Sequence, residues 1–186
     1  AACKGLFSWL RQEQADVVCL QETRAQSQYL PPDPYHPPGY DCTYHDARRK
    51  GYSGVALYAR RAPDEIRAGL GWPECDAEGR WLEARFGSLS VVSLYLPSGS
   101  SSPERQAVKF DFLQRLVEPL RALRASGRDV ILGGDWNIAH REIDLKSWRA
   151  NRKHSGFLPE ERAWMDDLFG SLGWLDAFRI VNPHPD

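Results

Sequence analysis

The sequence predicts an α/β fold, and two features of its 186 residues support this. Short apolar runs of strand length recur along the chain, and stretches with helical periodicity lie between them. Two of the runs, 81–86 and 89–96, are separated only by Gly87-Ser88, and strands with so short a connection pair antiparallel. Because 42% of the residues are hydrophobic, a single domain of this length can fill its own core.

The individual elements follow from periodicity and from the residues that begin or end them. An amphipathic helix is expected over 2–14, a second from Ser102-Pro103-Glu104 to 125–127, and a third from near Pro159 to Gly173. Pro119 should kink or split the second helix. Strands are predicted at 16–20, 55–58, 81–86, 89–96, 129–133 and 176–181, with a hairpin turn at 78–80 and a proline-rich surface loop at 31–38.

Composition excludes several classes of protein. The net charge of -1 gives no overall field for nucleic acid, so any such binding must depend on local basic patches. The four cysteines have no paired spacing, which favours a reduced setting without structural zinc. No apolar run is long enough for a membrane span, and no signal peptide is recognisable. The chain opens without Met inside a helical pattern, so an upstream segment is expected to be missing.

The candidate site begins at the apolar run 130–132, which two glycines and then Asp135 and Asn137 follow. Residues two apart on an extended backbone point the same way, so this strand end should present a carboxylate and a carboxamide together. A carboxylate can bind a hard cation or take a proton from water, and an amide can orient an anionic oxygen. The pair therefore suits hydrolysis of a phosphate ester. The alternative is an Asx-type turn in which both side chains satisfy loop backbone.

Two further predicted strands also end in polar residues. Glu22 follows the strand 16–20 and is a candidate ligand for Mg²⁺ or Mn²⁺, although a surface glutamate capping a loop would have the same pattern. Tyr95 ends the strand 89–96, where its phenol could donate to a phosphate oxygen or pack on the rim of the loop.

Two loops carry most of the local basic character. The segment 48–54 joins Arg48, Arg49 and Lys50 to Tyr52 between glycines, which fits phosphate contact or a solvated basic turn. The segment 141–154 holds five Arg or Lys residues against two acidic ones, with Trp148 among them. Basic residues interleaved with an aromatic side chain are typical of a nucleic-acid-binding loop.

Five stretches together resemble the exonuclease III family of abasic-site DNA endonucleases, in the endonuclease/exonuclease/phosphatase superfamily. They are Leu20-Gln21-Glu22-Thr23, Gly51-Tyr52-Ser53-Gly54-Val55, Tyr95-Leu96-Pro97-Ser98-Gly99, the run from Gly134 to His140, and Asn151 through Arg162. The last stretch is the most specific of the five, and it favours the DNA-repair branch of the superfamily over sphingomyelinases or inositol phosphatases. The resemblance implies a four-layer, DNase I-like α/β sandwich of two packed mixed β-sheets flanked by helices.

The resemblance also implies roles for individual residues. Glu22, Asp135 and Asn137 would form the site for Mg²⁺ or Mn²⁺, and Tyr95, Asp135 and Asn137 would act on the scissile phosphate, with Asp135 positioning or deprotonating the attacking water. The expected contacts to DNA are Arg49, Tyr52, Arg80, Asn151, Arg152 and His154. His154 stands where the family commonly has a second asparagine, and histidine can also donate to phosphate.

The same resemblance implies what the protein does and what the chain lacks. It implies a hydrolase of base excision repair, a Mg²⁺-dependent AP endonuclease with 3′–5′ exonuclease or 3′-phosphodiesterase activity on double-stranded DNA, monomeric and cytoplasmic at the nucleoid. The family's first strand with its asparagine, its Gly-Trp-Arg-x-Asp-Tyr segment and its Ser-Asp-His motif are not in this sequence. The chain is thus expected to be a partial domain, incomplete at both ends, that alone neither cuts DNA nor folds stably. A phosphodiesterase for another ester and an inactive DNA-binding remnant are the alternatives.

Overall fold

The computed structural model describes residues 5–184, and within them the chain divides into two compact units. The first unit runs up to Tyr95 and also includes Gly127–Asp135, and it contains both β-sheets. The second unit consists of Leu96–Ser126 and the residues from Trp136 onward, and its regular structure is helical. That the two units together form the single domain expected from the sequence stays a prediction.

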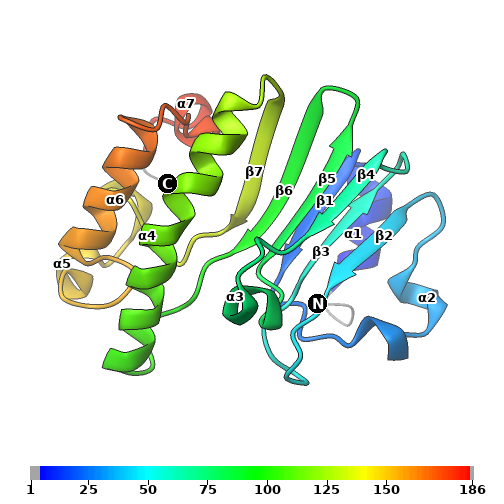
Figure 1. The fold of residues 1–186 in the computed structure, drawn as a ribbon, viewed down its shortest axis with the longest axis horizontal. Coiled ribbons are helices and arrows are strands. Elements are labelled where there is room, and N and C mark those ends of the chain that lie inside the picture. Colours follow the sequence, from blue (N-terminus) through cyan, green and yellow to red (C-terminus); the bar gives the residue numbers. More distant parts are fainter. Residues whose placement is uncertain (1–4, 185–186) are drawn as a thin grey trace. The chain divides into compact units, whose positions relative to one another are not determined.

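The first unit holds a three-stranded and a four-stranded sheet (Figure 1). The first sheet has the order β1-β3-β2, with β1 at Val17–Gln21, β3 at Val55–Ala59 and β2 at Asp41–His45, and both of its pairings are antiparallel. The second has the order β4-β5-β6-β7, with bounds Glu65–Ala68, Trp81–Phe86, Leu89–Tyr95 and Asp129–Asp135. Its β6 and β7 run parallel, so only this sheet is mixed.

The two sheets pack on each other through alternate side chains of their strands. Val55 and Leu57 of β3 meet Leu82 and Ala84 of β5 and Val91 of β6 in one buried cluster. The opposite face of β3 carries Ala56 and Tyr58, and these pack with Val18 and with helix α1 (Leu6–Glu13) through Phe7 and Leu10. Successive side chains of a strand point to opposite faces, and every residue of β3 is buried, so both faces of β3 are covered. The predicted α/β fold with two packed sheets is confirmed.

The second unit contains α4 (Pro103–Ala125), α5 (Trp148–Asn151), α6 (Pro159–Phe169) and α7 (Ala177–Val181). Ser102 caps α4 by accepting the Arg105 amide at 3.3 Å, as its sequence predicts. The Trp164 indole of α6 donates to the Leu113 carbonyl of α4 at 3.1 Å, which joins the two helices.

Four local predictions are corrected by the structure. Of the kink or split predicted at Pro119, the split does not occur: helix α4 continues through Pro119, with Leu116 and Leu120 on either side fully buried and holding the helix in place. Residues 176–181 form α7 and not a strand, since the Asp176 carboxylate caps the Arg179 amide at 3.0 Å. The proline-rich loop contains one irregular turn, α2 (Pro32–Tyr35). The segment 78–80 follows α3 (Pro73–Ala77) and is not a hairpin turn between β4 and β5.

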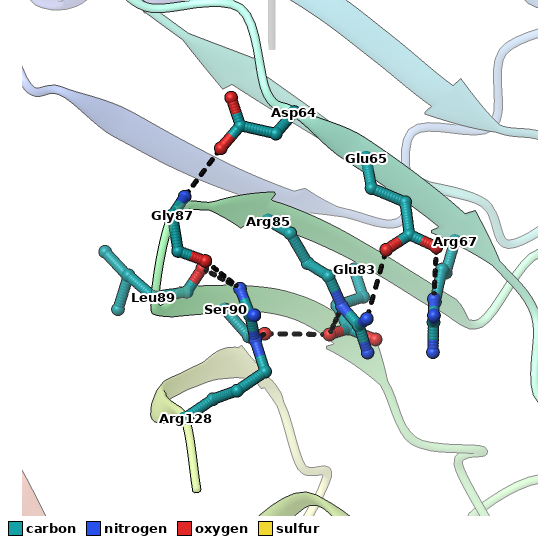
Figure 2. Close-up of polar contacts among 9 residues, drawn as sticks. All are labelled: Asp64, Glu65, Arg67, Glu83, Arg85, Gly87, Leu89, Ser90 and Arg128. Carbon is teal, nitrogen blue, oxygen red and sulfur yellow. Dashed lines mark hydrogen bonds and ion pairs between the residues drawn. The ribbon is translucent and has the colours of Figure 1, made fainter. Parts of the chain in front are cut away.

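Polar side chains tie the strands of the second sheet together (Figure 2). Arg85 of β5 pairs with Glu83 of the same strand and with Glu65 of β4 at 2.7 and 3.0 Å. Arg128, directly before β7, donates to the hydroxyl of Ser90 at 2.8 Å and to the carbonyl oxygens of Gly87 and Leu89. These contacts fix the start of β7 against the start of β6, and so help to set the register that ends at Tyr95 and Asp135.

In the described part of the chain, none of the helices combines the length and apolar character needed to cross a membrane.

Candidate active site

Glu22 lies in the loop directly after β1. Its φ is 53° and that of Arg24 is 50°, so two non-glycine residues here adopt left-handed backbone conformations. The Thr23 and Arg24 amides donate to the carbonyl oxygens of Gly54 and Ser53 at 3.1 and 2.8 Å. A Cβ on Gly54, whose φ is 89°, would collide with the Thr23 hydroxyl. The second glycine of the Gly-Tyr-Ser-Gly-Val motif thus lets the Thr23 side chain lie against the backbone at Gly54, and in this loop the Glu22 side chain is 46% exposed.

Tyr95 meets Glu22 from the end of β6. Its hydroxyl donates to Glu22 Oε1 at 3.3 Å, and the Arg24 guanidinium pairs with the same oxygen. Burial raises the pKa of the Tyr95 phenol above its ordinary value, and the negative charge of Glu22 raises it further, against a lowering by Arg80. Tyr95 is therefore a neutral hydrogen-bond donor at physiological pH.

Asp135 ends β7 beside Tyr95. The parallel register pairs these two residues across the strand ends, and the carboxylate of Asp135 is a further cause of the raised pKa of Tyr95. Just before it, a Cβ on Gly134 would collide with the Leu94 carbonyl, so the glycine permits β7 to lie this close to β6. The first unit thus brings together Glu22, Tyr95 and Asp135, which the sequence placed at three separate strand ends.

The Arg80 guanidinium lies over the ring of Tyr95, and the Arg80 side chain is only 2% exposed. The guanidinium lies 4.9 Å from the centroid of the Tyr95 ring and donates to the Tyr95 carbonyl at 2.9 Å, to Glu78 at 2.6 Å and to the Tyr52 hydroxyl at 3.2 Å. Arg49 lies over the other tyrosine, 5.4 Å from the ring centroid of Tyr52. Three donors of Arg80 are thus used inside the protein, which makes it a support for both tyrosines.

The remaining candidate residues lie in the second unit. Asn137 has a φ of 50°, and its carboxamide donates to the Leu96 carbonyl at 2.8 Å. The Asn151 carboxamide donates to the Ser147 carbonyl at 2.9 Å, and the His154 amide donates to the carbonyl of Asn151 at the same distance. Arg152 and His154 are exposed. Asn151 therefore organises the turn that presents these two side chains to solvent.

Two residues of this unit were not predicted to matter. Lys109 of α4 and Glu161 of α6 form an ion pair with both side chains 0% exposed. The only sequence signals are a lysine in a helix of largely apolar periodicity and a glutamate in the first turn of a helix, where a solvated residue is the ordinary expectation.

The residues of the first unit fit a hard divalent cation in their chemistry. Glu22 and Asp135 offer carboxylate oxygen beside Tyr95, and Mg²⁺ is usually bound by one or two carboxylates while it keeps several waters. Within residues 5–184, no group of three or more His, Cys, Asp or Glu side chains is placed to share an ion. This donor set suits an ion that retains water, in contrast to the closed four-ligand arrangement of structural zinc.

Comparison with known proteins finds relatives that match almost all of this chain. The Bacillus subtilis protein named exodeoxyribonuclease is 36% identical over 179 residues, which cover 95% of this chain and 68% of that protein. The DNA repair nuclease APEX1 of Danio rerio is 36% identical over 187 residues, 97% of this chain. The chain spans only 58% of the length of that relative.

Solved structures have the same fold. An AP endonuclease from Archaeoglobus fulgidus aligns with a TM-score of 0.83 at 26% identity, over 96% of this chain and 68% of that chain. A 3′–5′ exonuclease from Neisseria meningitidis aligns with a TM-score of 0.87 at 25% identity, over 98% and 70% of the two chains. The DNase I-like fold class is thereby confirmed. The endonuclease/exonuclease/phosphatase family matches residues 3–185, and the chain belongs to this family.

Proposed function

We propose that this protein is a DNA-repair phosphodiesterase that hydrolyses the DNA backbone at abasic sites, with accompanying 3′–5′ exonuclease or 3′-phosphodiesterase activity. The observation that carries the proposal is the convergence of Glu22, Tyr95 and Asp135 at neighbouring strand ends of the first unit. Relatives named for DNA repair nuclease and exodeoxyribonuclease activity support DNA as the substrate.

Each residue has a part in the proposed reaction. Glu22 and Asp135, with Asn137, would hold Mg²⁺ or Mn²⁺, and a bound ion would neutralise charge that develops on the phosphoryl group. Asp135 accepts the proton of the attacking water. Tyr95 donates to a phosphate oxygen, and its raised pKa keeps that proton in place. Asn137 adds an amide that orients the phosphate without adding negative charge.

Contacts to DNA come from residues of the two basic loops, of which Arg49, Arg152 and His154 are exposed. We assign Arg49 and Tyr52 to the first loop and Asn151, Arg152 and His154 to the second, with phosphate oxygen as the common target. Arg80 is buried and uses three of its five N–H donors inside the protein, so we assign its effect on DNA to the placement of Tyr52 and Tyr95. A monomer acting on double-stranded DNA in the cytoplasm, at the nucleoid, completes the proposal.

The test is incision of a duplex that carries one abasic analogue, measured for the protein at its full natural length with Mg²⁺, with Mn²⁺ and with EDTA. Incision at the analogue that EDTA abolishes is the expected result. Cleavage that persists in EDTA would contradict the metal dependence. Binding without cleavage would identify the inactive DNA-binding alternative, and hydrolysis of a simple phosphodiester in place of the duplex would identify a phosphodiesterase for another substrate.

A further inference from the structure

The second unit contains a fully buried ion pair, which packing alone does not require. Lys109 Nζ lies 2.6 Å from Glu161 Oε1, and both side chains are 0% exposed. Removing two charges from water is costly, and hydrophobic residues of similar volume often fill such a space with no loss of stability. A pair of this kind calls for a role that apolar side chains could not perform.

Lys109 uses its charge to hold the backbone of a candidate active-site residue. Its Nζ donates to the Asn137 carbonyl at 2.7 Å. The same asparagine has a left-handed φ of 50°, and its carboxamide is held by the Leu96 carbonyl at 2.8 Å. One bond therefore fixes the peptide of Asn137 and another fixes its side chain.

Glu161 holds the loop that follows the second basic segment. Its Oε2 accepts the amides of Gly156 and Leu158 at 2.7 and 3.0 Å, and its Oε1 accepts the Gln106 carboxamide at 3.0 Å. The Gly156 carbonyl in turn accepts the Ala139 amide at 2.8 Å. The ion pair thus links the turn at Asn137 to the loop 155–158 through charge-assisted hydrogen bonds, which are stronger than neutral ones.

We infer that Lys109 and Glu161 are positioning residues, which hold the Asn137 amide and the loop 155–158 in the geometry that phosphodiester hydrolysis requires. The inference rests on the function proposed above. Reacting groups must be held within about 0.5 Å of their productive positions, and a displacement of about 1 Å can cost on the order of 10² in rate. Neither residue touches the substrate in this scheme, and both act through Asn137 and the loop.

The test replaces the pair by apolar residues in the full-length protein. The double variant Lys109→Met/Glu161→Leu preserves volume, and its urea transition verifies that it is folded. We expect kcat on the abasic duplex to fall roughly 10- to 100-fold while KM stays within about threefold of wild type, because the DNA-binding side chains remain. A folded double variant with wild-type kcat would overturn the inference, since it would show that the pair serves packing alone.

The matched control is an exposed ion pair on the same helix, Arg121 with Glu118, whose side chains are 59% and 76% exposed. Arg121→Gln/Glu118→Gln should leave both kcat and KM at wild-type values. If the apolar double variant does not unfold cooperatively, the neutral double variant Lys109→Gln/Glu161→Gln replaces it, because it removes the charge-assisted bond and leaves no unpaired buried charge. The same fall in kcat is expected for this variant, and a wild-type kcat would have the same adverse meaning.

A readout that is independent of catalysis separates this inference from the proposed function. In the wild type the two side-chain NH₂ protons of Asn137 should give a pair of sharp NMR signals with slow hydrogen exchange, and in the folded variants broadened signals with fast exchange. An unchanged signal would overturn the positioning role even in an active enzyme. A wild type that does not cut DNA, but whose Asn137 signal changes as expected in the variants, would refute the proposed function and leave the network intact.

Discussion

Glu22 and Glu161 are both glutamates at the edge of a regular element, yet their surroundings are opposite. Glu22 is 46% exposed and has the side chains of Tyr95 and Arg24 as partners, the latter itself 62% exposed. Glu161 is 0% exposed, and its partners include Lys109 and two backbone amides. A carboxylate whose partners can swing into solvent can exchange them for a ligand. A carboxylate whose lone pairs are occupied by buried donors can only hold its neighbours in place.

The comparison implies that loss of charge should affect chemistry at Glu22 and structure at Glu161. Asp135 belongs with Glu22, because it is exposed at the end of β7 in register with Tyr95.

Asp135→Asn should have the largest effect on catalysis. The substitution removes a proton acceptor and keeps the shape of the side chain, so incision should fall by about 10² to 10⁴ while DNA binding is largely retained. Single-turnover incision and fluorescence anisotropy of the labelled duplex measure the two quantities. Asp129→Asn, at the opposite and also exposed end of β7, is the control and should cut at the wild-type rate. An Asp135→Asn enzyme within threefold of wild type would place Asp135 outside the reaction.

Glu161→Gln should have the largest effect on stability. The change leaves the Lys109 ammonium buried without its counter-charge, and breaking a buried pair in this way typically costs about 3–5 kcal/mol. Glu22→Gln, the same substitution at the exposed site, should leave the urea midpoint close to that of wild type. The comparison fails if the two variants have similar midpoints, or if Glu22→Gln is the less stable one.

The strand-end residues were predictable because their signal is local. An apolar run followed by glycine or a polar residue marks where a strand ends, and this placed Glu22, Tyr95 and Asp135 correctly at the ends of β1, β6 and β7. That these three residues come together could not be predicted from the local sequence. It depends on the parallel register of β6 and β7, which contacts between residues distant in sequence help to set, such as the bond from Arg128 to Ser90.

The buried ion pair of Lys109 and Glu161 was not predicted, because helical periodicity identifies the apolar face of a helix from several turns together and does not give the burial of single residues. The helical period of the sequence places Val108 on the apolar face of its helix, but Val108 is 43% exposed, whereas its neighbour Lys109 is buried. A glutamate in the first turn of a helix is ordinarily solvated, but the Glu161 carboxylate accepts the Leu158 amide and also pairs with the buried ammonium of Lys109. A buried charge becomes recognisable only when its partner is known, and here the partners are 52 residues apart.

The affinity for a divalent metal ion tests whether the exposed carboxylate of Glu22 binds a ligand. Glu22→Gln should weaken Mg²⁺ or Mn²⁺ binding by on the order of tenfold or more, since even loss of a residue that only orients a ligand costs this much. Isothermal calorimetry of the full-length protein measures it. Glu13→Gln, an exposed glutamate on α1, is the control and should bind the ion as wild type does. Unchanged affinity in Glu22→Gln would leave Glu22 as a loop residue without a metal.

The smallest expected effect is a change in the titration of Tyr95. Burial and the negative charge of Glu22 raise the pKa of this phenol, so its proton is present at neutral pH and is lost only when the pH rises through the raised value. Glu22→Gln removes one of these causes and should move the titration to lower pH, while Glu13→Gln should not move it. The phenolate absorbance of each protein, minus that of its Tyr95→Phe counterpart, isolates this tyrosine. A titration that stays in place would mean that the phenol does not sense the Glu22 carboxylate, and would contradict the placement of the two side chains beside each other.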